Sequence, residues 1–419
     1  MQALLAPLAE LADYQEIRKD RKKESGMIQI AGCVNSQKTH LMYALGDGFE
    51  YRVIAFSSEE KAKKAYEEYR IFTEDVYLYP ARDLLFYYAD IKGRLLTDSR
   101  MAVLRALIEK EGPGDVTVIT TMDAFLDGLA QPSELKRQRI TLESGDTVDL
   151  TELESRLTGM GYERADQIEG PGQFAVRGGI MDVFPLTEEL PVRIELWGDE
   201  IDSLRSFDAE SQRSIENLNQ VTIYPASENW SEGMETVSFL SYFPKEKSLL
   251  LLDEPLRLQE MAETVEQEYF HSRENRLESG IEGEETSLTV YETKDIIARM
   301  NGYHGIALTT LETKCGLFKV RSVYSIQTKG VNPYNNSFEL LTRDLKRLKR
   351  NGYRAVLLSG SRTRAKRLAE DLRDYDLSSF YSDDMEREAK PGEIMVAYGS
   401  VAEGYEYPML KFVVISESD

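Results

Sequence analysis

Short apolar runs alternate with amphipathic helical patterns over the first 130 residues of the chain. Residues 94–110 place Met101, Leu104, Leu107 and Ile108 at helical spacing on one face. Short apolar runs bounded by turn residues are typical of buried strands, and they occupy 27–31, 52–56, 75–79 and 116–120. Strands separated by helices predict a parallel sheet with right-handed crossovers.

The pattern changes near residues 131–132, where strands come to dominate. Turn signals at Gly178-Gly179 and Gly198-Asp199 indicate hairpins, which join antiparallel strands. The expected strands are 172–177, 179–184, 192–196, 200–207 and 220–224. This part of the chain therefore predicts a small α+β module.

Alternating strands and helices return after residue 225. A strand pattern covers 248–252 and a long charged helix pattern covers 255–278. A second change falls at 330–336. The helix patterns 338–351 and 362–373 and the strand patterns 353–358, 394–398 and 412–415 then predict one further small α/β unit.

Composition limits the chemistry that this chain can perform. It has 51 basic and 73 acidic side chains, a net charge of −22, which repels nucleic-acid phosphates outside a local basic patch. The two cysteines and three histidines share no metal-ligand spacing, so we expect no metal site. No segment predicts a signal peptide or a membrane span. A reducing, cytoplasmic setting without membrane contact fits best.

The segment 32–39 carries most of a phosphate-binding loop. Gly32, Lys38 and Thr39 match the pattern G-x-x-x-x-G-K-[ST] between a strand and a helix, but Gln37 replaces the second glycine. A side chain there fills the space in which backbone N–H groups surround phosphates. Asp253 and Glu254 follow a buried strand, as do carboxylates that position magnesium in such enzymes.

Two interpretations of this loop stay open. It is either an ordinary strand–loop–helix turn or the remnant of a nucleotide site whose Lys38, Thr39, Asp253 and Glu254 once acted on ATP and magnesium. In both cases we expect the loop to be inactive, with no cofactor and no catalytic residue in this chain.

A second group of residues resembles a binding surface. In the strand 192–197, Val192, Ile194 and Leu196 share one face, which leaves Arg193, Glu195 and Trp197 on the other. Arginine and tryptophan are enriched in interface hot spots, and Arg177 ends a neighbouring strand. The alternative is a surface Arg–Glu pair beside a tryptophan that its own domain half covers.

Residues 174–185, 192–208 and 211–214 resemble the second domain that bacterial transcription-repair coupling factors share with the repair protein UvrB. In that family this domain docks UvrA. The resemblance implies UvrA-facing positions at Phe174, Arg177, Arg193, Glu195 and Trp197. Residues 79–83, 100–107 and 248–255 resemble the family's first domain, and residues 392–399 with 404–406 resemble the coupling factor's third.

The resemblance implies a multidomain α/β fold. A degenerate P-loop NTPase-like domain with a parallel sheet would comprise 1–135 and 227–332. The UvrA-docking α+β domain, 136–226, would be inserted into it, and a small α/β domain, 333–419, would follow.

Two departures from UvrB favour the coupling factor. UvrB has an intact P-loop and a long tyrosine-rich hairpin. This chain has Gln37, and only a short stretch that holds Phe86, Tyr87 and Tyr88 stands where the hairpin would be. The resemblance implies that RNA polymerase, DNA and an ATP- and magnesium-dependent translocase motor belong to parts of the full-length protein beyond residue 419. The rival hypothesis is a UvrB-like, ATP-dependent DNA repair enzyme with its own nucleotide site.

One basic concentration, between residues 338 and 373, allows a third hypothesis. Arg343, Lys346, Arg347, Lys349 and Arg350 lie within the helix pattern 338–351. Direct DNA binding would use such a patch. We favour a solvated helix face instead, because Leu341, Leu345 and Leu348 form an ordinary core stripe and no aromatic residues interleave.

Overall fold

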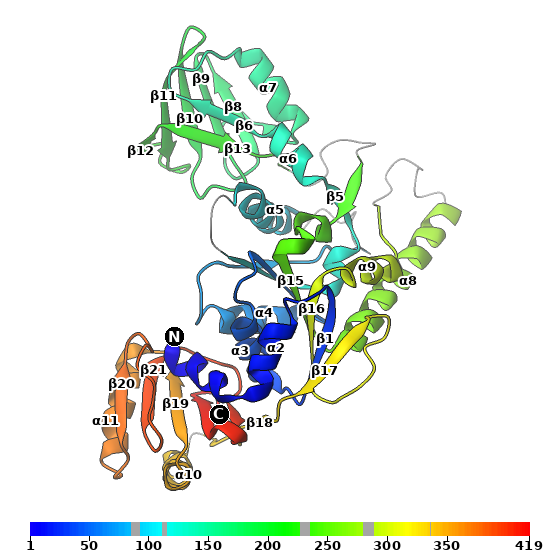
Figure 1. The fold of residues 1–419 in the computed structure, drawn as a ribbon. Helices are drawn as coiled ribbons and strands as arrows, with labels where there is room; N and C mark the ends of the chain where they lie inside the picture. The colour runs from blue at the N-terminus through cyan, green and yellow to red at the C-terminus, as the bar shows by residue number, and fades with distance from the viewer. Residues whose placement is uncertain (85–92, 111–114, 227–234, 280–288, 336) are drawn as a thin grey trace.

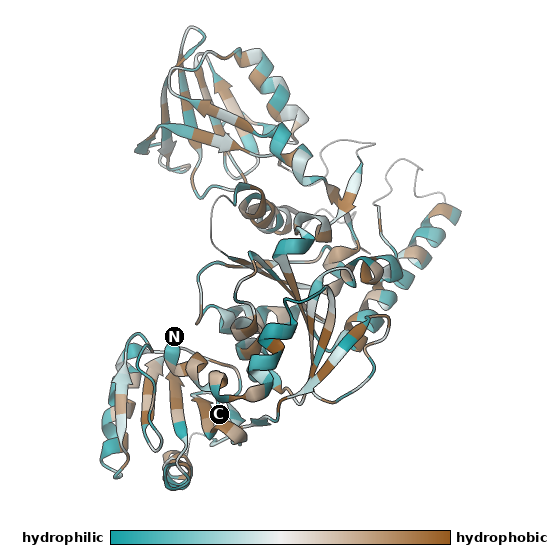
Figure 2. Ribbon diagram, viewed as in Figure 1, coloured by the Kyte–Doolittle hydropathy of each residue, from teal (hydrophilic) through white to brown (hydrophobic). Residues whose placement is uncertain are grey.

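The computed structural model describes residues 1–84, 93–110, 115–226, 235–279, 289–335 and 337–419 (Figure 1). The short stretch with Phe86, Tyr87 and Tyr88 lies outside the described residues. The chain forms an α/β fold of several sheets, which confirms the predicted fold class. Figure 2 shows hydrophobic residues along the central strands and hydrophilic residues on outward helix faces.

A seven-stranded parallel sheet forms the middle of the molecule, in the order β17-β1-β16-β15-β2-β4-β3. Its five inner strands are almost entirely buried, as expected for a sheet covered on both faces, whereas the edge strand β17 is partly exposed. They are β1 (Gly26–Ala31), β2 (Tyr51–Phe56), β3 (Val76–Tyr79), β4 (Val116–Thr121), β15 (Ser248–Asp253), β16 (His304–Thr309) and β17 (Val320–Ser325). Strands β1–β4, which come before the inserted unit in sequence, interleave with β15–β17, which come after it. Neither set of strands can therefore form the whole sheet alone.

Helices cover both faces of this sheet. One face packs against α3 (Asn35–Leu45) and α4 (Glu59–Tyr69), whose first turn is capped by the Ser58 hydroxyl. The same core receives the N-terminal helices α1 (Gln2–Leu5), η1 (Ala6–Glu10) and α2 (Ala12–Asp20). The other face packs against α5 (Gly93–Glu109), α8 (Pro255–Glu278) and α9 (Thr293–Met300).

Residues 140–223 form a separate unit at the top of Figure 1. Its six-stranded sheet runs β12-β11-β10-β9-β8-β7. The strands are β7 (Glu163–Arg164), β8 (Gln173–Arg177), β9 (Ile180–Phe184), β10 (Val192–Trp197), β11 (Glu200–Phe207) and β12 (Ser214–Leu218). The inner face packs against α7 (Leu150–Gly159) and the pair β6 (Ile140–Glu143) and β13 (Gln220–Ile223).

Two connections join this unit to the parallel sheet. Near them, β5 (Gly128–Ala130) pairs antiparallel with β14 (Thr236–Ser238). Helix α6 (Pro132–Gln138) leads from β5 into the inserted unit, and η3 (Phe239–Tyr242) leads from β14 back toward β15. The Tyr242 hydroxyl donates to the carbonyl of Ala130 over 2.7 Å and ties these two connections together.

A third sheet, in the order β18-β22-β23-β19-β21-β20, completes the fold. It comprises β18 (Lys329–Gly330), β19 (Arg354–Ser359), β20 (Ser379–Ser382), β21 (Ile394–Tyr398), β22 (Tyr405–Tyr407) and β23 (Phe412–Ser416). One face carries α10 (Phe338–Arg350) and α11 (Arg362–Arg373), and the other shares its core with α3 and the N-terminal helices. The proposed division at 135, 226 and 332 stays a prediction.

The basic helix α10 buries Leu345 and Leu348, as its stripe predicts. Its outward Arg347 pairs with Asp344, and Lys349 donates to the carbonyl of Asp376. These local contacts are what a solvated helix face requires. Within the described ranges, no helix combines the length and apolarity needed to cross a membrane.

Candidate functional site

The outer face of the inserted unit's sheet holds a buried carboxylate between two arginines. Asp182 on β9 is 1% exposed and lies opposite Arg193 in the ladder. Arg193 donates to its two oxygens over 2.7 and 2.9 Å, and Arg177 donates to Oδ2 over 2.7 Å. Two guanidinium groups and one carboxylate leave a local excess of positive charge on an acidic chain.

Arg193 is fixed from several sides. Its guanidinium lies over the Phe207 ring, 4.3 Å from the centroid, and donates to the Gln212 side chain over 2.9 Å. The hydrogen bonds to Asp182 raise the pKa of Arg193, although partial burial acts in the opposite direction. Its side chain is only 16% exposed, whereas that of Arg177 is 48% exposed. Arg177 is therefore the arginine more accessible to a partner.

Trp197 is the most exposed large hydrophobic residue in the described part of the chain, at 85%. It ends β10 at a hairpin whose Gly198 has φ +65°, a conformation that glycine adopts without strain. The predicted alternative of a half-covered tryptophan is therefore wrong. Glu195, two residues before it, pairs with Arg205 and accepts from the Ser203 hydroxyl, so Glu195 is not paired with Arg193.

Phe174 does not lie on this surface, contrary to the expectation from the resemblance. It is 1% exposed and packs in the inner core with Val183 and Ile194. The ladder explains this, because Phe174 lies opposite Val183, which lies opposite the inward-facing Val192. Arg177, Arg193, Glu195 and Trp197 are at least partly exposed on the opposite face.

The P-loop-like segment lies at the carboxyl edge of β1. Helix α3 begins at Asn35, inside the motif, so Ser36 and Gln37 are already helical. A phosphate-binding loop needs several successive backbone N–H groups that turn toward the ligand before the helix begins. Here Gln37 is fully buried, and its side-chain oxygen accepts the N–H of Val34 over 3.2 Å. The Gln37 side chain thus occupies the N–H of Val34, one of the loop's few backbone donors.

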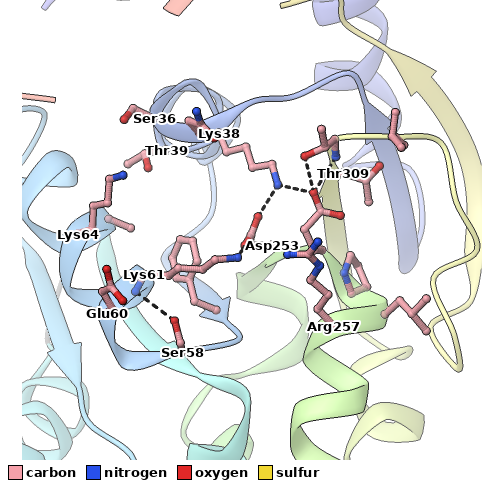
Figure 3. A pocket seen from close by; sticks show the side chains of 18 of the residues that line it. Ser36, Lys38, Thr39, Ser58, Glu60, Lys61, Lys64, Asp253, Arg257 and Thr309 are labelled. Atoms are coloured by element: carbon pink, nitrogen blue, oxygen red, sulfur yellow. Dashed lines mark hydrogen bonds and ion pairs between the residues drawn. The ribbon is translucent and has the colours of Figure 1, made fainter. Parts of the chain in front are cut away.

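Lys38 is paired within the protein (Figure 3). Its ammonium donates to Asp253 over 2.6 Å and to Glu254 over 2.7 Å, and Lys61 reaches the other oxygen of Asp253 over 3.2 Å. Burial alone would lower the pKa of Lys38, but the two carboxylates raise it overall. The three residues Lys38, Asp253 and Glu254 are called the lysine triad below.

Glu254 has a left-handed backbone, with φ +51°, which is unfavourable for a side chain with a Cβ. Thr310 compensates, since its N–H and hydroxyl donate to the Glu254 carboxylate over 2.8 and 2.7 Å. Partial burial raises the pKa of Glu254, yet the hydrogen bonds and charge of Lys38 lower it overall. Glu254 therefore supplies a negative charge from within the protein that pairs with Lys38.

A cavity of about 750 Å³ lies beside the lysine triad. The buried Thr39 also lines it. Basic and acidic side chains line it in equal number, so it offers a polyphosphate no net attraction. They are Lys38, Lys61, Lys64, Arg257 and Lys314, and Glu60, Glu68, Asp253, Glu254 and Glu403. The described residues contain no cluster of three or more side chains suited to hold a metal ion.

Three residues that contact the predicted site residues within the chain were not expected from the sequence. Asp182 organises Arg177 and Arg193, Thr310 holds Glu254, and Tyr407 contacts Gln37. A signal existed for Asp182, an acidic residue beyond the Gly178-Gly179 turn that a hairpin places beside both arginines. None existed for Thr310 and Tyr407, which lie far away along the chain.

Comparisons with known proteins point to the same inserted unit. Residues 140–229 match the family model described as the UvrB interaction domain. The chain is 26% identical to the transcription-repair-coupling factor of Bacillus subtilis over 86% of its own length and 35% of that protein. It is 26% identical to the Staphylococcus epidermidis factor over 82% of this chain and 34% of that protein. The chain thus spans about a third of these relatives' length.

We predict different effects for the two arginines on folding. Arg193→Ala should lower the free energy of unfolding of the inserted unit by roughly 2 kcal/mol, because the buried Asp182 would lose two hydrogen bonds. Arg177→Ala should cost less than about 1 kcal/mol, since Arg177 is half exposed. Urea denaturation followed by circular dichroism measures both. Equal losses in the two variants would contradict this arrangement.

The lysine triad also makes a prediction about pH. Glu254 has a folded pKa below its usual 4.5, so its contribution to stability is complete above that value and is lost as the pH falls through the folded pKa. Wild-type protein should therefore melt at a higher temperature than Glu254→Gln at pH 7, and the difference should shrink below about pH 4.5. Calorimetry from pH 7 to pH 3 checks this. A pH-independent difference would count against it.

Proposed function

We propose that this chain, which fits an N-terminal fragment of a transcription-repair coupling factor, recruits UvrA through its inserted unit. The observation that carries the proposal is Trp197, which is 85% exposed at the end of the strand that carries Arg193, within the matched interaction domain. Tryptophan and arginine are the residue types most enriched in interface hot spots. The whole activity is transcription-coupled nucleotide excision repair, to which this chain contributes the contact with UvrA.

The proposed docking combines an apolar anchor with fixed positive charge. Trp197 would be buried by UvrA and supply most of the binding energy, as tryptophan does in hot spots. Arg177 would donate to a carboxylate of UvrA while Asp182 holds its guanidinium in place. Arg193 already donates from Nε and Nη2 to Asp182 and from Nη2 to Gln212, so it mainly positions Asp182.

Trp197→Ala tests this proposal most directly. We expect it to weaken UvrA binding by about 2 kcal/mol or more, roughly a thirtyfold rise in Kd, because the anchor is lost. Isothermal titration calorimetry with purified UvrA measures the change.

Met409→Ala provides the matched control, since Met409 is 74% exposed on the third sheet's unit, outside the matched domain. Met409→Ala should leave the affinity unchanged. Circular dichroism should show intact folds for both variants, since neither side chain is part of a core. An unchanged Kd for Trp197→Ala would refute docking through this surface.

The rival function, an ATP-dependent DNA repair enzyme, would require Lys38 and Thr39 to bind MgATP. We propose instead that this segment binds no nucleotide, because Glu254 and Asp253 already neutralise Lys38 and α3 begins inside the loop. Millimolar MgATP should then leave the melting temperature unchanged. A rise of several degrees that Lys38→Ala abolishes would support the rival.

The remaining partners are proposed from the resemblance alone. RNA polymerase, duplex DNA and an ATP-driven motor would belong to segments outside residues 1–419 of a full-length protein. The setting would be the cytoplasm, where UvrA and RNA polymerase act.

A further inference from the structure

Gln37, the residue that breaks the P-loop pattern, contacts a distant part of the chain. Its side-chain nitrogen donates to the hydroxyl of Tyr407 on β22 over 2.9 Å, across 370 positions of sequence. Both residues are buried, at 0% and 1% exposure. The contact therefore joins α3, which follows the P-loop-like segment, to the unit built on the third sheet, here called the third domain (333–419).

The contact continues as a chain of hydrogen bonds through Tyr407 and His40, called the relay below, in which each donor and acceptor can be assigned. His40 Nε2 lies 3.0 Å from the carbonyl of Leu4, which can only accept, so this nitrogen carries the proton. His40 Nδ1 must then accept from the Tyr407 hydroxyl, 2.9 Å away. The Tyr407 oxygen is left to accept from Gln37, whose amide can donate. Burial lowers the pKa of His40 to about 4, which keeps the ring neutral as the relay requires.

A second set of contacts lies one residue earlier on α3. The N–H groups of Ala402 and Glu403 donate to Glu68 over 2.9 Å and to the Ser36 hydroxyl over 3.1 Å. Ser36 in turn donates to Glu68. Lys64 pairs with Glu403 over 3.0 Å at the rim of the cavity. Side chains at two consecutive motif positions, Ser36 and Gln37, thus hold the third domain.

Apolar packing surrounds these polar contacts. His40 stacks on Tyr405 with ring centroids 5.3 Å apart, and Val401, Tyr405 and Tyr407 belong to the same core as α3 and the N-terminal helices. A polar group buried in such a core is costly without a partner, so the relay has to be satisfied as a unit.

From these contacts we propose that the P-loop-like segment is the docking platform of the third domain, and that Gln37 is its latch. In this interpretation Gln37, which stands in place of the second glycine of the P-loop pattern, adds a contact to the third domain. This contact is independent of UvrA binding. The latch makes the N-terminal helices, the parallel sheet and the third domain move as one body.

Hydrogen exchange measured by mass spectrometry tests the latch in the full 419-residue chain. Gln37→Gly, which restores the P-loop pattern, should speed exchange in residues 399–414 and 35–45 about tenfold by removing a buried hydrogen bond. Tyr407→Phe removes only the relay hydroxyl and should have the same effect if Gln37→Gly folds poorly. The matched control is Tyr405→Phe, whose hydroxyl takes no part in the relay; it should leave exchange unchanged.

Three further outcomes separate this proposal from the others. Peptides of residues 140–223 should exchange as in the wild type, and UvrA affinity should stay constant in both latch variants. Gln37→Gly should also fail to gain a MgATP-dependent rise in melting temperature. Unchanged exchange at 399–414 in both variants would overturn the latch, as would MgATP binding by Gln37→Gly.

Discussion

The proposed docking surface depends on one buried carboxylate, that of Asp182. An unpaired carboxylate at 1% exposure would destabilise the sheet, so Asp182 requires the two arginines. Asp182 in turn fixes their guanidinium groups, and the guanidinium of Arg193 also stacks on the Phe207 ring. The surface beside Trp197 is thus ordered before any partner arrives, which reduces the entropy lost on binding.

The lysine triad illustrates the opposite use of the same chemistry. In a working nucleotide site, Lys38 would have a phosphate as its counter-ion, and the carboxylates would hold magnesium. Here the carboxylates bind the lysine directly, and the strained backbone of Glu254 is held by Thr310. The electrostatics of the site are satisfied within the chain, which makes the cavity beside it a neutral space.

Much of the fold follows from local patterns, because the strands of a parallel sheet are continuous apolar runs. The predicted strands 27–31, 52–56 and 116–120 correspond to β1, β2 and β4 within a residue or two. The outward face of Arg193, Glu195 and Trp197 followed from simple alternation. The expectation for Phe174 was wrong because it came from the resemblance, which does not say on which face of the sheet a residue lies. The contacts of Gln37 and Glu254 were beyond reach, since nothing local indicates which distant segment will cover a helix or a strand end.

The strand order of the parallel sheet has a consequence for how the chain is made. β1 and β2 are neighbours in sequence, but β16 and β15 lie between them in the sheet. A ribosome releases those two strands only after the inserted unit has been translated. β2, β4 and β3 can pair with one another at once, but β1 and one edge of β2 must wait for partners that follow the inserted unit. The inserted unit can meanwhile complete its own local hairpins. On this basis the inserted unit folds before the sheet that carries it.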